Sequence, residues 1–180
     1  MNRKNMLFVI VGILLISTRM WLSFGTVYFD ITNDIIGFVL IILGMKDLRT
    51  LNSRFKKGFV MSLLGLLASA ASQLIMVIDW KEAESSMLTA AIGLGVIFNI
   101  YFTYYFTEAL ILTAKAQEKL AVTRNYQSSW LLLSGCLFVH YFVFKANTSI
   151  GSILLEALIA VLAFFYCYTV YTTSKQLYED

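Results

Sequence analysis

Charged residues are scarce in this chain. Only 14% of its 180 residues are charged and 59% are hydrophobic, and the mean hydropathy is +0.75. A soluble domain carries about 25% charged residues, so this chain lacks the polar surface that a water-exposed fold needs. The composition excludes a soluble globular domain. It indicates an integral membrane protein whose expected partner is the lipid bilayer, with no nucleic acid.

Proline is absent, and cysteine and histidine are nearly so. Without proline, we expect any break in a membrane helix to use glycine. Cys136 and Cys167 both fall in apolar segments without paired spacing, which is typical of small buried hydrophobes. The single histidine argues against a histidine-rich metal site. No zinc-protease, nucleophile-elbow, phosphate-loop or dinucleotide motif occurs. We therefore expect no metal, no cofactor and no recognisable catalytic set, which argues against an enzyme.

Six apolar segments fill most of the sequence. A spanning helix needs about 20 mainly apolar residues at about 1.5 Å of rise each. The segments cover about 6–24, 27–45, 59–78, 87–106, 129–144 and 150–171. The first is interpreted as an uncleaved span, because it is long, contains Arg19 and is followed by no small-residue cleavage site. The sequence predicts an all-α membrane bundle of six transmembrane helices, forming one domain over 1–180.

The second segment is the ambiguous one. Its uninterrupted apolar run, 35–45, is too short to cross a bilayer, and extending it back to 27 takes in Asp30, Asn33 and Asp34. The alternatives are a spanning helix with acidic groups near one mouth, or a re-entrant piece. The loop after it, 46–57, is strongly basic and belongs in the cytoplasm by the positive-inside rule. That placement favours a full crossing.

The basic residues predict the orientation of the bundle. Eleven of the 14 lysines and arginines fall on one side of the predicted membrane: Arg3, Lys4, Lys46, Arg49, Arg54, Lys56, Lys57, Lys115, Lys119, Arg124 and Lys175. Only Lys81 and Lys145 fall on the other side, and Arg19 lies within a span. The sequence therefore predicts a multi-pass protein of the plasma (inner) membrane with both termini in the cytoplasm.

Five ionisable residues are predicted inside the outer half of the membrane: Arg19, Asp30, Asp34, His140 and Glu156. A charge in the hydrocarbon costs at least about 2.5–3.5 kcal/mol on insertion scales, so such groups face the bundle interior or an interface. Helical rise places them at similar depths, so a shared polar chamber open to the outside is geometrically allowed.

The acidic residues of the second segment fall on one face of the predicted helix. Asp30, Asp34, Gly37, Ile41 and Gly44 follow one another at the spacing of a single helical stripe. Two carboxylates four residues apart repel each other unless a cation lies between them or one carries a proton.

Structural alternatives stay open at each of these positions. Arg19 is the nearest candidate partner for Asp34 as an ion pair, and Asp30 or Asp34 can cap the second helix. His140 can be a neutral core residue, and Glu156 a polar clamp between helices. Gln73 in the third segment and Asn99 in the fourth add uncharged polar groups.

Two functions follow as hypotheses. The first is a membrane protein that binds or transports a small molecule or ion through an outward-facing polar chamber lined by Arg19, Asp34, His140 and Glu156, with Asp30 at its mouth. The alternative is a non-catalytic accessory or assembly subunit. It would pack against another membrane protein through small-residue faces such as 65–69 and 91–95.

Overall fold

Six α-helices and one β-hairpin make up the chain in the computed structural model. In chain order they are α1 (Arg3–Ser17), β1 (Trp21–Phe24), β2 (Val27–Asp30), α2 (Asp34–Leu48), α3 (Ser53–Ile78), α4 (Ser86–Ala116), α5 (Leu120–Lys145) and α6 (Ser149–Tyr178). The backbone is described for 3–18, 21–24, 27–30, 34–78, 86–145 and 149–178, and side chains for 3–18, 34–74, 93–142 and 154–177. The prediction of an all-α fold with six helices is confirmed, and the hairpin is an addition to it.

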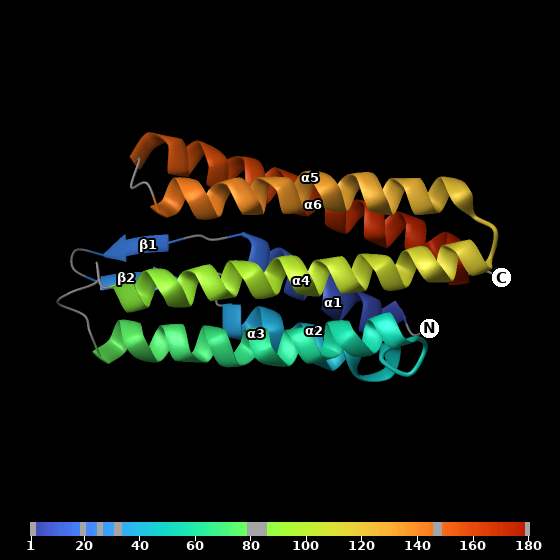
Figure 1. The fold of residues 1–180 in the computed structure, drawn as a ribbon, viewed down its shortest axis with the longest axis horizontal. Coiled ribbons are helices and arrows are strands. Elements are labelled where there is room, and N and C mark those ends of the chain that lie inside the picture. Colours follow the sequence, from blue (N-terminus) through green and yellow to red (C-terminus); the bar gives the residue numbers. More distant parts are fainter. Residues whose placement is uncertain are drawn as a thin grey trace.

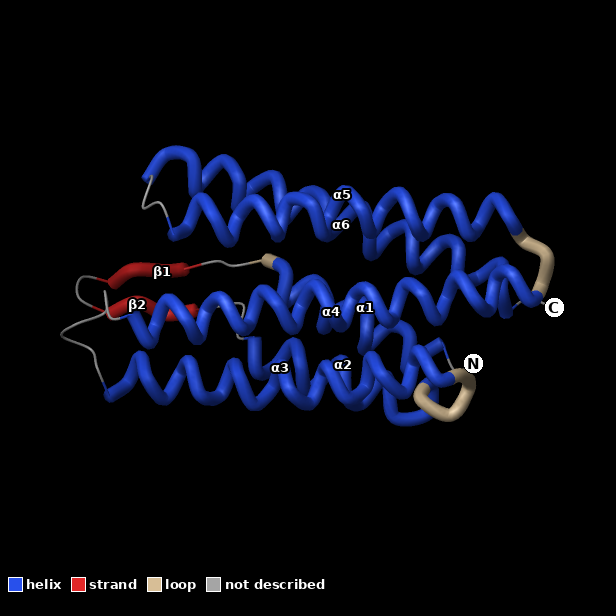
Figure 2. Tube along the Cα trace, in the orientation of Figure 1, coloured by secondary structure: helices blue, strands red, loops and turns tan. Residues whose placement is uncertain are grey.

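The helices run along one long axis, and both termini lie at the same end of the bundle, named here the termini end (Figure 1). Each helix packs against the next one in the chain, and α6 closes the ring by packing against α1. α1 also contacts α4 across the ring. The hairpin lies towards the opposite end of the long axis (Figure 2).

Helices α1 and α2 are much shorter than the other four. Each has 15 residues, or about 22 Å, whereas α3 to α6 have 26 to 31 residues, or about 39–46 Å. α1 ends seven residues before the predicted boundary at 24, and α2 begins seven residues after the predicted boundary at 27. Both lie closer to the termini end than to the end that holds the hairpin (Figure 1).

The residues between the two short helices explain the difference. β1 and β2 pair antiparallel, with Trp21 opposite Asp30 and Phe24 opposite Val27. Aromatic and β-branched residues such as these favour strands, but hydropathy alone cannot distinguish a short apolar strand from a helix. α1 ends without glycine, contrary to the expectation for a break. Instead the Thr18 hydroxyl donates to the Leu14 carbonyl at 2.6 Å.

Glycines bring α1 and α2 into close contact. A Cβ atom added to Gly12 would lie 2.6 Å from the Gly37 carbonyl oxygen, and one added to Gly37 would lie 2.5 Å from the Ile16 side chain. Gly44 meets the backbone of Asn5 in the same way. The predicted stripe of 37, 41 and 44 is therefore the face that α2 packs against α1.

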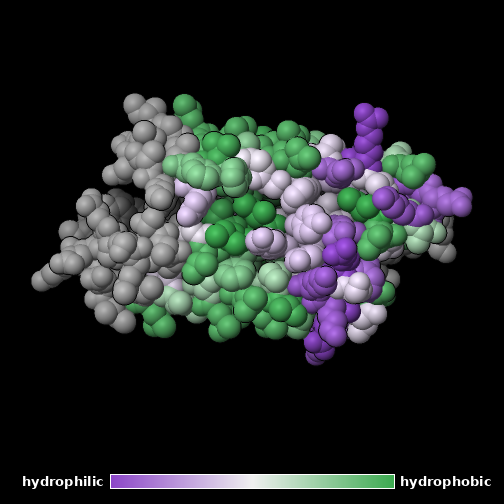
Figure 3. Space-filling model, viewed as in Figure 1, coloured by the Kyte–Doolittle hydropathy of each residue, from purple (hydrophilic) through white to green (hydrophobic). Residues whose placement is uncertain are grey.

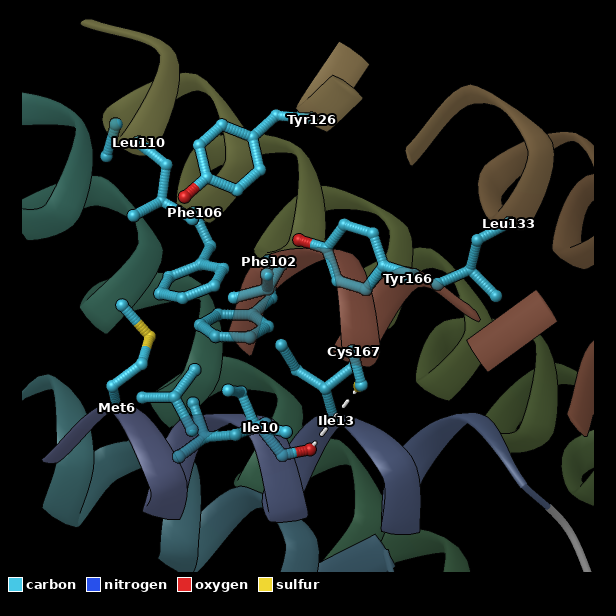
Figure 4. Close-up of a cluster of buried hydrophobic side chains, with 14 of the residues drawn as sticks. Met6, Ile10, Ile13, Phe102, Phe106, Leu110, Tyr126, Leu133, Tyr166 and Cys167 are labelled. Atoms are coloured by element: carbon cyan, nitrogen blue, oxygen red, sulfur yellow. Dashed lines mark hydrogen bonds between the residues drawn. The ribbon is translucent and has the colours of Figure 1, made fainter. Parts of the chain in front are cut away.

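The core lies where α1, α4 and α6 meet (Figure 4). Phe102 and Phe106 of α4 stack with ring centroids 5.9 Å apart and are fully buried. From α6, the Tyr166 hydroxyl shares a 2.7 Å hydrogen bond with Thr107, and the Cys167 thiol donates to the Ile10 carbonyl of α1 at 3.6 Å. The prediction that Cys167 is a buried hydrophobe agrees with this packing.

On the face that Figure 3 shows, hydrophobic side chains cover the middle, while hydrophilic ones gather towards the termini end. Among the described residues, three helices contain a window long and apolar enough to cross a membrane: Ser53–Leu74 of α3, Gly93–Ala116 of α4 and Leu154–Leu177 of α6. Large apolar side chains such as Leu67, Leu154 and Phe164 are exposed on them. These features are typical of a membrane-associated protein.

Candidate functional site

The predicted site residues lie on different parts of the bundle. Asp34 is the first residue of α2, His140 is near the end of α5, and Glu156 is in the second turn of α6. Asp30 ends β2, opposite Trp21. The side chains of Asp30 and Arg19 lie outside the described residues, so the predicted pairing of Arg19 with Asp34 stays a prediction.

His140 and Glu156 meet between α5 and α6. The Nε2 atom of His140 lies 3.6 Å from a carboxylate oxygen of Glu156. The His140 side chain is buried, whereas the Glu156 side chain is about one-third exposed, at 32%. Two of the five predicted residues are thus neighbours, as their similar depth indicated.

Asp34 lies apart from this pair. α2 packs against α1 and α3, and in the described part of the chain it has no contact with α5 or α6. The structure therefore holds two polar groupings on opposite sides of α1 and α4.

A second polar grouping forms at the level where α1 ends and α2 begins. Asn99 of α4 is 3% exposed, and its Nδ2 atom donates to the Ile16 carbonyl at 3.1 Å and to the Ser17 hydroxyl at 3.3 Å. The Asn99 side chain therefore caps the last turn of α1, where carbonyls lack partners within the helix. The Thr103 hydroxyl in turn donates to the Asn99 carbonyl at 2.9 Å.

Helix register brings Asp34 and Ser69 to the same level. Gly65 of α3 packs against the ring of Phe38 of α2. Ser69 lies one turn beyond Gly65, and Asp34 one turn before Phe38, so the antiparallel helices place both on facing positions. Ile16 packs against Gly37, about one turn from Asp34, and its carbonyl accepts from Asn99, so Asn99 lies about one turn from this level. The polar layer is defined here as Ser17, Asp34, Ser69 and Asn99.

Oxygen atoms of the polar layer are shielded from solvent. Ser69 and Asn99 are each 3% exposed, and Ser17 is 4% exposed. The Asn99 Oδ1 and Ser69 Oγ atoms are inaccessible to solvent and have no hydrogen-bond partner among the described residues. One carboxylate oxygen of Asp34 is likewise inaccessible to solvent. Buried polar atoms normally have hydrogen-bond partners, so the oxygen atoms of Asn99 and Ser69 are exceptions within the described part of the chain.

Polar groups at the termini end form close pairs. Arg54 of α3 lies 3.1 Å from a carboxylate oxygen of Glu108 on α4, which accounts for the charge of Glu108 within an apolar helix. Arg49 lies over the Phe59 ring and Lys57 over the Tyr105 ring. These contacts hold basic side chains against the bundle while leaving them near water.

The sequence signal for the polar layer was partial. Asn99 stands out as a polar residue inside a long apolar run, but Ser69 was interpreted only as a small packing residue. Ser17 had no distinguishing signal, because its role depends on the end of α1. No protein-family model, curated protein or solved structure matches this chain.

Proposed function

We propose that this chain is a six-pass protein of the plasma (inner) membrane, with both termini in the cytoplasm, that binds a small polar molecule or ion in its polar layer. Passage of that ligand across the membrane is the expected role. The observation that carries the proposal is the pair of solvent-inaccessible oxygen atoms on Asn99 and Ser69 without hydrogen-bond partners among the described residues. A ligand or ordered water at this level would satisfy them.

The lengths of the helices support this position for a ligand. Asn99 lies about 26 Å from the inner end of α4, which is about 46 Å long. The polar layer is therefore near the middle of the longest helix. Transporters commonly bind their substrates near the midplane, where discontinuous helices end.

The presence of the hairpin supports the proposal that the outer half of the bundle is open to water or covered by other protein segments. A two-stranded sheet leaves backbone N–H and C=O groups unpaired on its outer edges. Lipid cannot satisfy such groups, so irregular backbone at membrane depth occurs where it is buried or lines a cavity. β1 and β2 lie towards the end opposite the termini. The proposed route to the polar layer therefore starts from that end.

The distribution of charge supports the orientation. All lysines and arginines whose side chains are described belong to the set of 11 predicted on the cytoplasmic side, and the hydrophilic surface gathers at the termini end (Figure 3). By the positive-inside rule, this end belongs in the cytoplasm.

Cysteine accessibility tests the proposal without knowledge of the ligand. The background carries Cys136→Ser and Cys167→Ala, and Ser69→Cys is compared with Ser62→Cys in intact cells treated with a membrane-impermeant cationic methanethiosulfonate reagent. Ser62 and Ser69 lie two turns apart on one face of α3, and both are buried. We expect labelling of Ser69→Cys and little labelling of Ser62→Cys. Absence of labelling, or equal labelling of both variants, would overturn the proposal.

A second candidate function is an accessory subunit that docks on another membrane protein. The observation that favours it is Gly135 on α5, which has open space where a side chain would be and is flanked by exposed Leu131, Leu132, Phe138 and Phe142. Small residues on an apolar helix surface permit close approach of another helix. A stoichiometric protein that copurifies from native membranes, and is lost in Gly135→Leu, would favour this function.

A further inference from the structure

Two basic side chains meet on one tyrosine at the termini end, where α1 packs against α6. Arg3 is the first residue of α1, and its guanidinium donates to the Tyr171 hydroxyl of α6 at 2.9 Å. The Lys175 ammonium lies 4.5 Å from the centroid of the same ring, and the Arg3 guanidinium lies 6.0 Å from it. Helices α1 and α6 carry the two ends of the chain, which lie at the same end of the bundle (Figure 1). Two positive charges therefore share one neutral partner.

The charges of Arg3 and Lys175 are not balanced by an acidic side chain in the described part of the chain. Arg54, at the same end of the bundle, forms an ion pair with Glu108. Neither Arg3 nor Lys175 forms such a pair with a described residue, and both side chains are exposed. Two like charges at close range disfavour each other. An anion between them would relieve that repulsion through charge-assisted hydrogen bonds.

Exposed apolar side chains continue from this basic pair along α6. Cys167 and Tyr171 lie four residues apart and both contact α1, so one edge of α6 runs beside that helix. Tyr168 and Phe164 lie about one turn and two turns from Tyr171 towards the middle of the bundle, on the solvent side of that edge. They are 67% and 61% exposed, so α6 presents aromatic surface next to its contact with α1.

Helix α1 matches this arrangement. Arg3 and Ile10 both contact α6, so the side of α1 that includes them runs beside α6. Leu7 and Val11 lie one turn and two turns beyond Arg3, at the edge of this side, and are 39% and 44% exposed. The surface where α1 meets α6 therefore has a basic end and an apolar length. We name this surface the α1–α6 seam and define it by its two basic, two aromatic, one aliphatic and one bridging side chains: Arg3, Lys175, Phe164, Tyr168, Leu7 and Tyr171.

We infer that the α1–α6 seam binds an anionic phospholipid of the leaflet at the termini end, with the lipid phosphate between Arg3 and Lys175 and an acyl chain along the exposed apolar side chains. A guanidinium matches the geometry of a phosphate, and a lysine ammonium adds a point charge. A soluble anion would use the basic end of the seam and leave its apolar length uncovered, whereas an anionic phospholipid covers both. The inference goes beyond the proposed function, because it needs the termini end at the headgroups of a leaflet but no ligand in the polar layer.

Native mass spectrometry of the delipidated full-length protein in detergent tests the inference. The protein is titrated with dioleoyl phosphatidylglycerol and, separately, with dioleoyl phosphatidylcholine, which has the same acyl chains and no net charge. We expect the first phosphatidylglycerol to bind about tenfold more tightly than phosphatidylcholine. Arg3→Gln and Lys175→Gln should each weaken phosphatidylglycerol binding about fivefold, the order expected for one basic residue close to an anionic lipid. Binding of phosphatidylcholine should not change.

Two matched controls separate the seam from the general attraction of a basic surface. Arg49→Gln and Lys56→Gln remove the same charges at the termini end, where Arg49 lies over the Phe59 ring of α3 and Lys56 is exposed on α3. Helix α3 has no contact with α1 or α6 in the described ranges. Both controls should bind phosphatidylglycerol as the unsubstituted protein does. Equal losses in the controls and the seam variants, or no loss in either seam variant, would overturn the inference.

Two competitors identify what occupies the seam. Glycerophosphoglycerol keeps the phosphate but has no acyl chains, so it should compete poorly with phosphatidylglycerol. If it competes as well as the lipid at equal concentration, the seam takes soluble anions and the lipid inference falls. If phosphatidylglycerol binds only after Glu179→Gln and Asp180→Asn, the acidic end of the chain neutralises the basic pair, and the inference is overturned.

Failure of this inference differs from failure of the proposed function. Lipid binding in detergent does not depend on access to Ser69. If the seam binds phosphatidylglycerol as expected while Ser69→Cys stays unlabelled in cells, the proposed function falls alone. If Ser69→Cys is labelled while the lipid shows no preference for the seam, the lipid inference falls alone.

Discussion

The termini end and the polar layer both contain polar side chains in contact with neighbouring helices, but they use them differently. At the termini end, Arg54 pairs with Glu108, and Asn5 donates to Asp47 at 2.7 Å. In the polar layer, the donor atom of Asn99 is fully used while its acceptor has no hydrogen-bond partner among the described residues. One carboxylate oxygen of Glu108 is also buried, but the other lies 3.1 Å from the Arg54 guanidinium. The first region pairs its polar groups near water, and the second keeps two buried oxygen atoms without hydrogen-bond partners among the described residues.

The largest expected effect comes from the contact that positions the polar layer. Gly12→Ala places a methyl group 2.6 Å from the Gly37 carbonyl, so α1 and α2 must separate. We expect a loss of about 1–3 kcal/mol in the free energy of unfolding, the usual range for overpacking, measured by thermal unfolding in detergent. Gly135→Ala is the control, because it meets open space and should be neutral or stabilising by up to about 1 kcal/mol. Equal effects of the two substitutions would contradict the close α1–α2 contact.

The next effect concerns the cap on α1. Asn99→Leu removes the donor to the Ile16 carbonyl and leaves that buried acceptor unpaired, for which we expect a cost of about 1–3 kcal/mol. Thermal unfolding measures it, and hydrogen exchange should show faster opening of the last turn of α1. Asn125→Leu, on the exposed part of α5, should change neither quantity. An unchanged last turn in Asn99→Leu would show that the cap is unimportant.

A smaller effect is expected for the pair between α5 and α6. Glu156 is partly exposed, so its contact with His140 should contribute no more than about 1 kcal/mol. A double-mutant cycle with Glu156→Gln and His140→Gln measures the coupling free energy. A coupling well above that range would make this pair a stronger element of the bundle than its exposure indicates.

The smallest effect is expected at the termini end. Arg54→Gln breaks a partly exposed ion pair with Glu108, which we expect to cost about 0.2–1 kcal/mol. Added choline chloride should reduce the difference from the unsubstituted protein, because salt screens exposed charges. An effect as large as that of Asn99→Leu would remove the contrast between the two regions.

Hydropathy predicted the long helices because apolar residues, buried in the core or exposed on the surface, continue along most of their length. α4, predicted over 87–106 with a helical continuation, spans Ser86–Ala116. The lengths of α1 and α2 could not be predicted in the same way. Trp21, Leu22, Tyr28 and Phe29 are apolar and count towards a helix in any hydropathy window, although they pair as strands.

The candidate site was predictable only where depth alone decides proximity. His140 and Glu156 lie on consecutive helices, so similar depth was sufficient to make them neighbours. Asp34 was expected beside them, but the order of helices in the ring separates α2 from α5 and α6, and a sequence does not reveal that order. Ser69 became significant only when the register of α3 against α2 was known.

A high-resolution structure of the protein in lipid nanodiscs would show what lies against the buried oxygen atoms of the polar layer. We expect a non-protein peak, an ion or an ordered water, in contact with Asn99 Oδ1 or Ser69 Oγ, near the level where α1 ends. A structure in which these two oxygen atoms are satisfied entirely by protein groups, with α1 continuing as one helix to residue 24, would contradict this expectation.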